Sequence, residues 1–416
     1  MKKRNLQTNP CWSAKDLGEP LPISPHAVSV ALPRWQDVVD YENKDPGCLS
    51  SLKAIYPRFG FNPLIAELAN KSLKFHDERN QSSWPYPNIA TAASAQKHCQ
   101  KVNPDCQTKI KDFLGFKCLI VDKENTASAK AFWQHTGLGL SSREAAIALG
   151  KEAKPSIDDG QKARNELCNR LATLYDCERN LVHLHRSGMA ALTTTLNAIR
   201  KIRGNRRILQ VGFPYVDVLK LPQVIYQGSD LLVETSLAQI KRELEERNPA
   251  ALIIEIPSNP LLECVDLRSI SKLAHEQNIP VIVDDTIGSP INIDVTPFAD
   301  VIFSSLTKSF AGRGDILAGS VVISPYSKWK NELAEIIPNV ALSTLSDSDA
   351  IELEITSRDI IYRLKKLNNA CLQLKEKLET KKEISKVRYP NDCKNFNSLL
   401  KAGGGYGCLL SFELKG

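Results

Sequence analysis

Between residues 160 and 325 the chain alternates between short hydrophobic runs and segments with helical periodicity. In 162–177, Leu167, Leu171 and Leu174 recur at the spacing of one helix face. We predict helices at 162–177, 189–202, 237–248 and 267–278, and strands at 181–185, 207–212, 251–257, 280–285, 299–305 and 318–324. Continuous Val- and Ile-rich strands separated by helices predict an α/β fold, with a mostly parallel sheet and helices on both faces.

The flanking regions have a different texture. Residues 1–130 contain frequent prolines and few long periodic segments, which predicts an N-terminal extension with a small appended region, or arms around a neighbouring subunit. The pattern of 350–380 predicts long helices, and strands follow at ISKVRYP and GCLLSFEL. We therefore expect three parts: 1–130, a large domain at 131–325, and a partial, incomplete C-terminal domain at 326–416.

Composition excludes several classes of function. The net charge of +7 is spread along the 416 residues without a basic stripe, so we expect no nucleic-acid partner. No hydrophobic run approaches the roughly 20 residues that span a bilayer, and no apolar leader is evident, so we expect a cytoplasmic protein without a membrane partner. The eleven cysteines form no CxxC pair and are expected to be free thiols. His183 and His185 alternate along a predicted strand, which favours burial over a metal site.

Candidate chemistry follows the strands, because ligands of parallel α/β sheets bind at the carboxyl ends of the strands. Ser187 and Gly188 open a helix after one strand, where free backbone amides attract anions. Asp284 ends another strand, and Lys308 lies 24 residues further on, after the next strand. Each feature alone fits a turn, a cap or a surface charge. Together they match what pyridoxal phosphate (PLP) requires: a lysine, an acid for the ring nitrogen and a phosphate site.

Several stretches resemble the cystathionine γ-synthase family of Cys/Met-metabolism PLP enzymes. They are IEIPSNPLLECVDL, VIVDDTIGSP, ADVIFSSLTKSFAGRGDILAGSVV and the helix start Ser-Gly-Met. The opening stretch LGEPLPISPHAVSVALPRWQDVVDYE, with YPRFGFNP and AFWQHTGLGLSSREA, resembles the fungal branch. The resemblance covers most of the chain and is most specific between 181 and 325. It implies the aspartate-aminotransferase-like fold, PLP fold type I, with 131–325 as the PLP-binding domain.

The resemblance also implies roles for individual residues. Lys308 would be the catalytic lysine that carries the cofactor, and Asp284 would keep the ring nitrogen protonated. Tyr215 would stack on the ring as a second catalytic residue, although Val216-Asp217 replaces the family's usual Gly-Gly after it. The remaining expected cofactor contacts are Gly188, Met189, Ser305 and Thr307 at the phosphate, and Asn259 near the phenolic oxygen.

Members of the family also lend a Tyr-x-Arg motif across a dimer interface to the neighbour's phosphate. Two stretches compete for this role. Tyr56-Pro57-Arg58 matches the letters of the motif, whereas Arg143 in Ser141-Ser142-Arg143 matches its position better and is preferred, with Arg58 as the alternative. A homo-oligomer that binds small amino-acid substrates is expected.

The implied activity is PLP-dependent γ-replacement on an O-acylated homoserine with cysteine, which gives cystathionine for methionine biosynthesis. A sulfhydrylase or lyase of the same family is an alternative. Other departures are Asp285 in place of Asn, Ser309 in place of an aromatic residue, and Gly312-Arg313-Gly314-Asp315. The chain ends at Gly416, before the segment in which relatives supply an arginine for the substrate carboxylate. We therefore expect PLP binding with weak turnover, or an inactive homologue, unless a residue such as Arg358 replaces that arginine.

Overall fold

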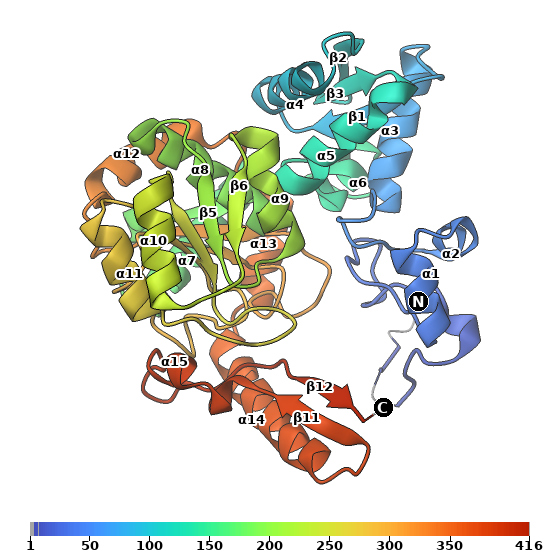
Figure 1. Ribbon diagram of the computed structural model, residues 1–416. Helices are drawn as coiled ribbons and strands as arrows, with labels where there is room; N and C mark the ends of the chain where they lie inside the picture. Colours follow the sequence, from blue (N-terminus) through green and yellow to red (C-terminus); the bar gives the residue numbers. More distant parts are fainter. Residues whose placement is uncertain (1–3, 7, 416) are drawn as a thin grey trace.

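The computed structural model describes residues 4–6 and 8–415, and its larger lobe is built on a seven-stranded sheet (Figure 1). The strand order is β4-β10-β9-β8-β7-β5-β6. All neighbours pair in parallel except β10, which is antiparallel to β9 and β4. The strands are β4 (Val182–His185), β5 (Ile208–Val211), β6 (Ser229–Leu232), β7 (Leu252–Glu255), β8 (Val281–Asp284), β9 (Val301–Ser305) and β10 (Gly319–Ile323).

Helices cover both faces of this sheet, as predicted. Successive residues of a strand point to opposite faces of the sheet. Val281 and Val283 pack into one hydrophobic cluster and Ile282 packs into the other. The first cluster includes residues of α7 (Ile157–Tyr175), α10 (Leu237–Arg247), α11 (Leu267–Glu276), α13 (Asp347–Thr356) and α14 (Ile360–Glu379). The second includes residues of α8 (Gly188–Arg203), α9 (Val216–Ile225) and α12 (Lys330–Val340). The mostly parallel α/β sheet is thus confirmed.

A smaller unit stands beside this lobe (Figure 1). Its three strands pair antiparallel in the order β1-β3-β2. It comprises α3 (Pro63–Phe75), β1 (Ser82–Tyr86), α4 (Ile89–Val102), β2 (Thr108–Phe113), β3 (Phe116–Val121), α5 (Thr126–Thr136) and α6 (Ser142–Ala148), and it is preceded by α1 (Trp35–Glu42) and α2 (Pro46–Ser51).

The expectation of few long helices before residue 130 is therefore wrong. The buried face of α4 consists of small or polar side chains, among them Thr91, Ala92, Ala95 and Cys99. Such residues give hardly any hydrophobic periodicity, although they pack closely against the small sheet.

The C-terminal part continues from α14 into β11 (Ile384–Arg388), α15 (Lys394–Asn397) and β12 (Ser411–Leu414). The last two predicted strands do pair, antiparallel to each other, but the second begins only at Ser411. The predicted long helices are two, separated between Thr356 and Ile360. Phe412 and Leu414 of β12 are exposed.

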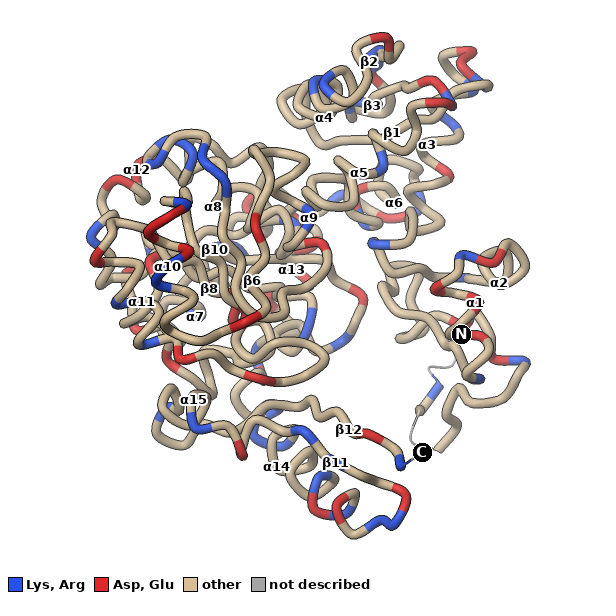
Figure 2. The backbone as a smooth tube through the Cα atoms, in the orientation of Figure 1, with Lys and Arg blue, Asp and Glu red and all other residues tan. Residues whose placement is uncertain are grey.

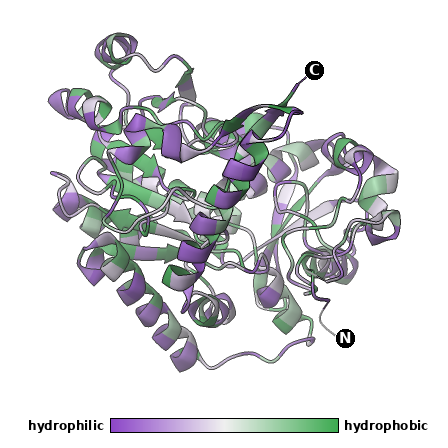
Figure 3. Cartoon of the chain, turned by 90° about the horizontal axis from the view of Figure 1, so that it is seen from below, coloured by the Kyte–Doolittle hydropathy of each residue, from purple (hydrophilic) through white to green (hydrophobic). Residues whose placement is uncertain are grey.

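Charge and hydropathy follow this layering. Figure 2 shows acidic and basic residues interspersed over both lobes. Figure 3 shows the most hydrophobic segments inside the larger lobe and hydrophilic residues along its outer helices. No helix among the described residues is both long and apolar enough to cross a membrane. All eleven cysteines are free thiols.

Candidate active site

A cavity of about 440 Å³ lies at the carboxyl ends of β7, β8 and β9. Residues 55–62 and the end of α5 contribute to its walls, so two parts of the chain far apart in sequence close it. All the site residues predicted from the sequence line this cavity except Arg143: Tyr56, Arg58, Gly188, Met189, Tyr215, Asn259, Asp284, Ser305, Thr307 and Lys308.

The N-terminus of α8 presents backbone amides to this cavity. Ser187 caps the helix, and its Oγ accepts the amide of Ala190 at 3.0 Å. The first bond along the helix axis runs from the Ala191 amide to the Ser187 carbonyl, which leaves the amides of Gly188 and Met189 for another acceptor. A side chain at Gly188 would place its Cβ 2.9 Å from the Ser305 Cβ, so the helix approaches β9 closely only with glycine here. This arrangement suits an anion such as phosphate.

Lys308 follows β9, and its side chain reaches across the cavity to the segment before α3. The Lys308 Nζ donates a hydrogen bond to the Tyr56 Oη at 3.0 Å. The same nitrogen lies 4.6 Å from the centre of the Tyr56 ring. The two residues are 252 positions apart in sequence, and the contact joins the exposed lysine amine to the segment before α3.

Two carboxyl groups lie side by side in the lining of the cavity, that of Asp284 buried and that of Glu255 partly buried. Glu255 ends β7 and Asp284 ends β8, and the two are register partners. Burial raises the pKa of Asp284, and burial together with the neighbouring Asp284 raises the pKa of Glu255. Their hydrogen-bond partners include backbone amides: the Thr286 amide donates to Asp284, and the Tyr215 amide donates to Glu255 at 2.7 Å. Among the described residues no cationic side chain pairs with either acid, so a cationic ligand would be stabilised here.

Tyr215 immediately precedes α9 and lines the same cavity. Burial raises the pKa of its phenol far above the ordinary value, and the neighbouring Tyr56 and Asp217 raise it further. Tyr215 is therefore a neutral hydrogen-bonding group at physiological pH. An aromatic ring here is available to stack on a flat ligand.

Two of the predicted phosphate contacts, Thr307 and Ser305, differ in whether the side-chain hydroxyl is available to a ligand. The hydroxyl of Thr307 accepts the Ala318 amide at 3.1 Å and donates to the Ala318 carbonyl at 3.3 Å, so its proton is already committed. The Ser305 amide donates to the Thr286 hydroxyl at 2.8 Å. The side chain of Ser305 faces the start of α8, where the free amides lie.

Arg143 does not line the cavity of its own chain, and its contact with a neighbour's phosphate stays a prediction. It is 6% exposed, and its guanidinium donates to the Asp315 carbonyl at 2.7 Å and pairs with Asp349 at 3.2 Å. Arg58 does line the cavity and forms only a partly exposed pair with Glu42 at 3.3 Å. Arg358 pairs with Glu354 and lies outside the lining as well.

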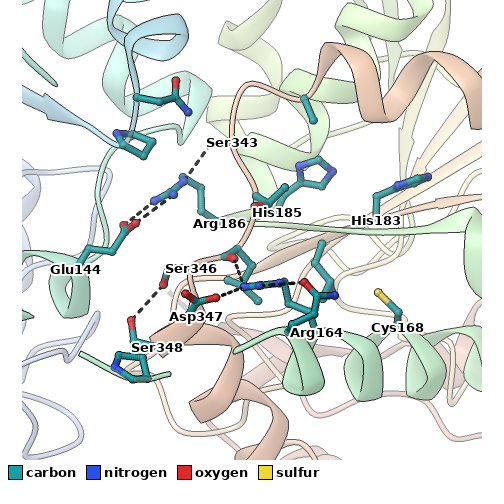
Figure 4. A pocket seen from close by; sticks show the side chains of 18 of the residues that line it. Glu144, Arg164, Cys168, His183, His185, Arg186, Ser343, Ser346, Asp347 and Ser348 are labelled. Carbon is teal, nitrogen blue, oxygen red and sulfur yellow. Dashed lines mark hydrogen bonds and ion pairs between the residues drawn. The ribbon is translucent and has the colours of Figure 1, made fainter. Parts of the chain in front are cut away.

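A second cavity, of about 990 Å³, surrounds the edge strand β4 (Figure 4). Arg186 lines both cavities and pairs here with Glu144 at 2.7 Å, while Arg164 pairs with Asp347 at 2.6 Å. His183 and His185 lie on its wall, and burial lowers their pKa values to about 4 and about 3. Among the described residues no group of three or more His, Cys, Asp or Glu is placed to hold a metal ion.

Sequence reasoning missed Glu255 and Asp217. Glu255 ends β7 just as Asp284 ends β8, but the predicted strand ran on to residue 257, so the rule that identified Asp284 did not identify Glu255. Asp217 carries no such signal. It matters because of His135, which lies 82 positions earlier in the chain and 2.8 Å away in space.

Comparison with family models agrees with this geometry. Residues 159–416 match the model described as Cys/Met metabolism PLP-dependent enzyme. Residues 64–141 match the N-terminal domain of fungal trans-sulfuration enzymes, which corresponds closely to the smaller unit.

Curated relatives are similar over nearly the whole chain but differ in activity. The L-2-amino-4-chloropent-4-enoate dechlorinase/desaturase of Streptantibioticus cattleyicolor is 28% identical, over 95% of this chain and 82% of its own. The cystathionine gamma-synthase of Neurospora crassa is 25% identical over 96% and 86%. The alanine racemase ungC of Aspergillus violaceofuscus is 26% identical over 93% and 80%.

Solved structures support the fold. The cystathionine gamma synthase of Xanthomonas oryzae pv. oryzae superposes with a TM-score of 0.53 at 24% identity, over 64% of this chain and 69% of that one. The cystathionine gamma-lyase of Lactobacillus plantarum gives the same score at 21% identity, over 64% and 70%. At this identity the likeness establishes the architecture, which is the predicted PLP fold.

Proposed function

The chain belongs to the Cys/Met metabolism PLP-dependent enzymes, and on that premise we propose that it replaces the γ-substituent of an O-acylated homoserine with cysteine. The product would be cystathionine, which belongs to transsulfuration and methionine biosynthesis. Relatives named cystathionine gamma-synthase support this reaction, as does the resemblance of the fungal-type opening stretch. The observation that carries the proposal is that Lys308, Asp284 and the start of α8 surround one cavity.

The residues present fit PLP in three respects. The free amides of Gly188 and Met189 suit the phosphate. Because residue 188 is glycine, no side chain separates the start of α8 from Ser305. The buried carboxyl of Asp284 has no cationic side chain as a partner in the described chain, which suits a protonated ring nitrogen. The Lys308 amine is an exposed nucleophile at the mouth of the cavity.

We assign the following tasks to these residues. Bound PLP supplies an electron sink for a negative charge at the substrate Cα. Asp284 keeps the ring nitrogen protonated, and Tyr215 packs against the ring as a neutral phenol. With PLP bound, Lys308 would accept the proton from Cα, release it, and only then, as a free amine again, accept one from Cβ; Cβ and Cα would each regain a proton as the product forms. The acyl group leaves Cγ with its bonding electrons, and the cysteine thiolate forms the new bond to Cγ.

For the phosphate we propose Arg58 rather than Arg143, since only Arg58 lines the cavity. Ser305 and Asn259 are proposed as further cofactor contacts, and Thr307 as a residue that shapes the loop before Lys308. Tyr56 and Arg58 reach the cavity of their own chain here. We still predict a homo-oligomer. Light scattering on the purified chain measures its mass in solution and so tests this prediction.

The activity test offers each co-substrate separately to the PLP-loaded chain. O-acetyl- and O-succinylhomoserine are supplied with cysteine, with sulfide or with no thiol, and cystathionine, homocysteine and 2-oxobutyrate are quantified. Cystathionine as the main product supports the proposal. Homocysteine would identify a sulfhydrylase, 2-oxobutyrate a lyase, and a PLP-loaded chain without any product an inactive homologue. The Lys308→Ala variant is the control for uncatalysed reactions.

A further inference from the structure

A buried carboxylate stands beside Tyr215, where the resembling family has glycine. Asp217 lies in the first turn of α9, is 2% exposed and lines the cavity. Its Oδ1 accepts two hydrogen bonds from α5, one from Gln134 Nε2 at 2.9 Å and one from His135 Nδ1 at 2.8 Å. The smaller unit thus fixes the orientation of a carboxylate within the active site of the larger lobe.

The contacts of Asp217 continue toward Tyr215. Both hydrogen bonds from α5 go to Oδ1, and Asp217 also interacts with the Tyr215 phenol. Tyr215 interacts in turn with Tyr56, whose hydroxyl accepts the bond from the Lys308 Nζ. All four side chains line the cavity, and Tyr56 and Asp217 both raise the pKa of Tyr215, so the two phenols link Lys308 electrostatically to Asp217 in one series.

The direction of the protons in this series follows from what each group can donate. A carboxylate only accepts, so His135 and Tyr215 both donate to Asp217. The Tyr215 oxygen is then free to accept from Tyr56, and the Tyr56 oxygen accepts from Lys308. Every proton points away from Lys308 and toward Asp217. The negative end of the series favours positive charge at its other end.

We propose that Asp217 is a positioning residue that fixes the phenol of Tyr215 and, through Tyr56, the orientation and charge of Lys308. This inference rests on the proposed role of Lys308 as the lysine that carries PLP. Under this proposal the smaller unit contributes to the active site of the larger lobe, because Gln134 and His135 hold Asp217 in place. Asp217 itself touches neither substrate nor cofactor in this assignment.

The test uses Asp217→Asn, which keeps the shape of the side chain and removes its charge. The readouts are the pH midpoint of the visible absorbance of bound PLP and the dissociation constant of PLP. Removal of the charge should lower the midpoint by about half a pH unit or more, because the protonated form loses a favourable field. The dissociation constant should rise by roughly fivefold.

Asp300→Asn is the matched control. Asp300 is 1% exposed and pairs with His275 at 2.8 Å, but it lies outside the cavity lining. It therefore reports what the loss of a buried Asp–His pair does by itself. We expect the Asp300 variant to keep the midpoint of the wild-type chain even if its unfolding temperature falls.

Tyr56→Phe interrupts the series in the middle and does not depend on the folding of the Asp217 variant. If the series is real, Tyr56→Phe shifts the midpoint as well, and the double variant shifts it no further than the larger single change. An unchanged midpoint in both variants, an equal shift in the Asp300 variant, or fully additive shifts would overturn the inference. Failure of the proposed function is distinguishable, because it would appear as retained covalent PLP in Lys308→Ala.

Discussion

Two cavities of this chain have Arg186 in common but differ in how the charges around them are compensated. Around the larger one, beside β4, Arg186 pairs with Glu144 and the partly buried Arg164 pairs with Asp347. The histidines there are neutral, since burial lowers their pKa values. Around the smaller one, at the carboxyl ends of β7 to β9, the partly buried Glu255 and the buried Asp284 have no cationic partner in the described chain.

This difference is more informative than the sizes of the cavities. A buried acid without a counter-charge destabilises the folded chain, and a ligand that supplies the counter-charge recovers that free energy. Compensated pairs gain little from a ligand. The smaller cavity is thus the one whose charges favour a bound cationic ligand. Arg186 lines both cavities, but its charge is already compensated by Glu144.

The largest expected effect comes from Lys308→Ala. It removes the only amine that we assign to the proton transfers, so turnover should fall by roughly 10²- to 10⁴-fold. The visible absorbance of covalently held PLP should disappear while the unfolding temperature changes little, since Lys308 is exposed. Arg164→Ala in the compensated cavity serves as the comparison and should retain the absorbance. Absorbance and borohydride labelling unchanged in the Lys308 variant would exclude the assignment.

Asp284→Asn should have the next largest effect. The variant keeps the side-chain volume but cannot hold the ring nitrogen charged, so exchange of the substrate α-proton should slow on the order of 10²-fold. PLP should still bind. Deuterium exchange at Cα, followed by NMR, measures the step directly. Asp347→Asn, which breaks a pair in the other cavity, should leave the exchange rate unchanged, and an unaffected rate in Asp284→Asn would remove its role.

Asp285→Asn sharpens the comparison by its effect on stability. Asp285 is 1% exposed, and burial raises its pKa to about 7. An acid with a raised pKa stabilises the fold when protonated, so the unliganded chain should lose stability as pH rises from about 4 to about 7. Asparagine does not ionise, so in the variant the loss of unfolding free energy with rising pH should be smaller by up to about 4 kcal/mol.

Chemical denaturation of the PLP-free chain at pH 5 and pH 8 measures this effect. The increase in the free energy of unfolding of the variant over the wild-type chain should be largest at pH 8. Tyr175 and Ser304 both donate to Asp285, so one of these bonds must adapt to the amide. Asp37 is a useful contrast, because hydrogen bonding to Arg34 lowers its pKa and its loss should matter more at high pH than at low. A slope with pH that Asp285→Asn leaves unaltered would contradict the prediction.

The smallest effect is expected for the two competing arginines. Arg58→Ala should weaken PLP binding by about fivefold or less, because Arg58 is partly exposed and its charge is screened. Arg143→Lys, which keeps a positive charge between Asp315 and Asp349, should leave PLP affinity unaltered. A titration followed by cofactor fluorescence distinguishes the two. The opposite ranking would restore Arg143 as the phosphate contact.

Local pattern was sufficient for the larger lobe. Buried parallel strands are hydrophobic over their whole length, so 251–257, 280–285 and 299–305 stand out between amphipathic helices. Because ligands bind where such strands end, the pattern also located Asp284 and Lys308 before any contact was known. The small buried side chains of α4 provide no comparable pattern, and for the smaller unit the sequence therefore predicted an appended region without its individual helices and strands.

Pairings between distant segments were decided by tertiary structure alone. Position along the chain favoured Arg143 over Arg58, but the partners of Arg143, Asp315 and Asp349, lie 172 and 206 positions away in sequence and hold its guanidinium outside the cavity of its own chain. Tyr56 meets Lys308 across 252 positions, and His135 meets Asp217 across 82. Such contacts depend on how two lobes pack, and periodicity reports only neighbours along one helix or strand. The sequence by itself thus identified the groups to which we assign the chemistry, and the packing of the lobes decided which side chains contact those groups.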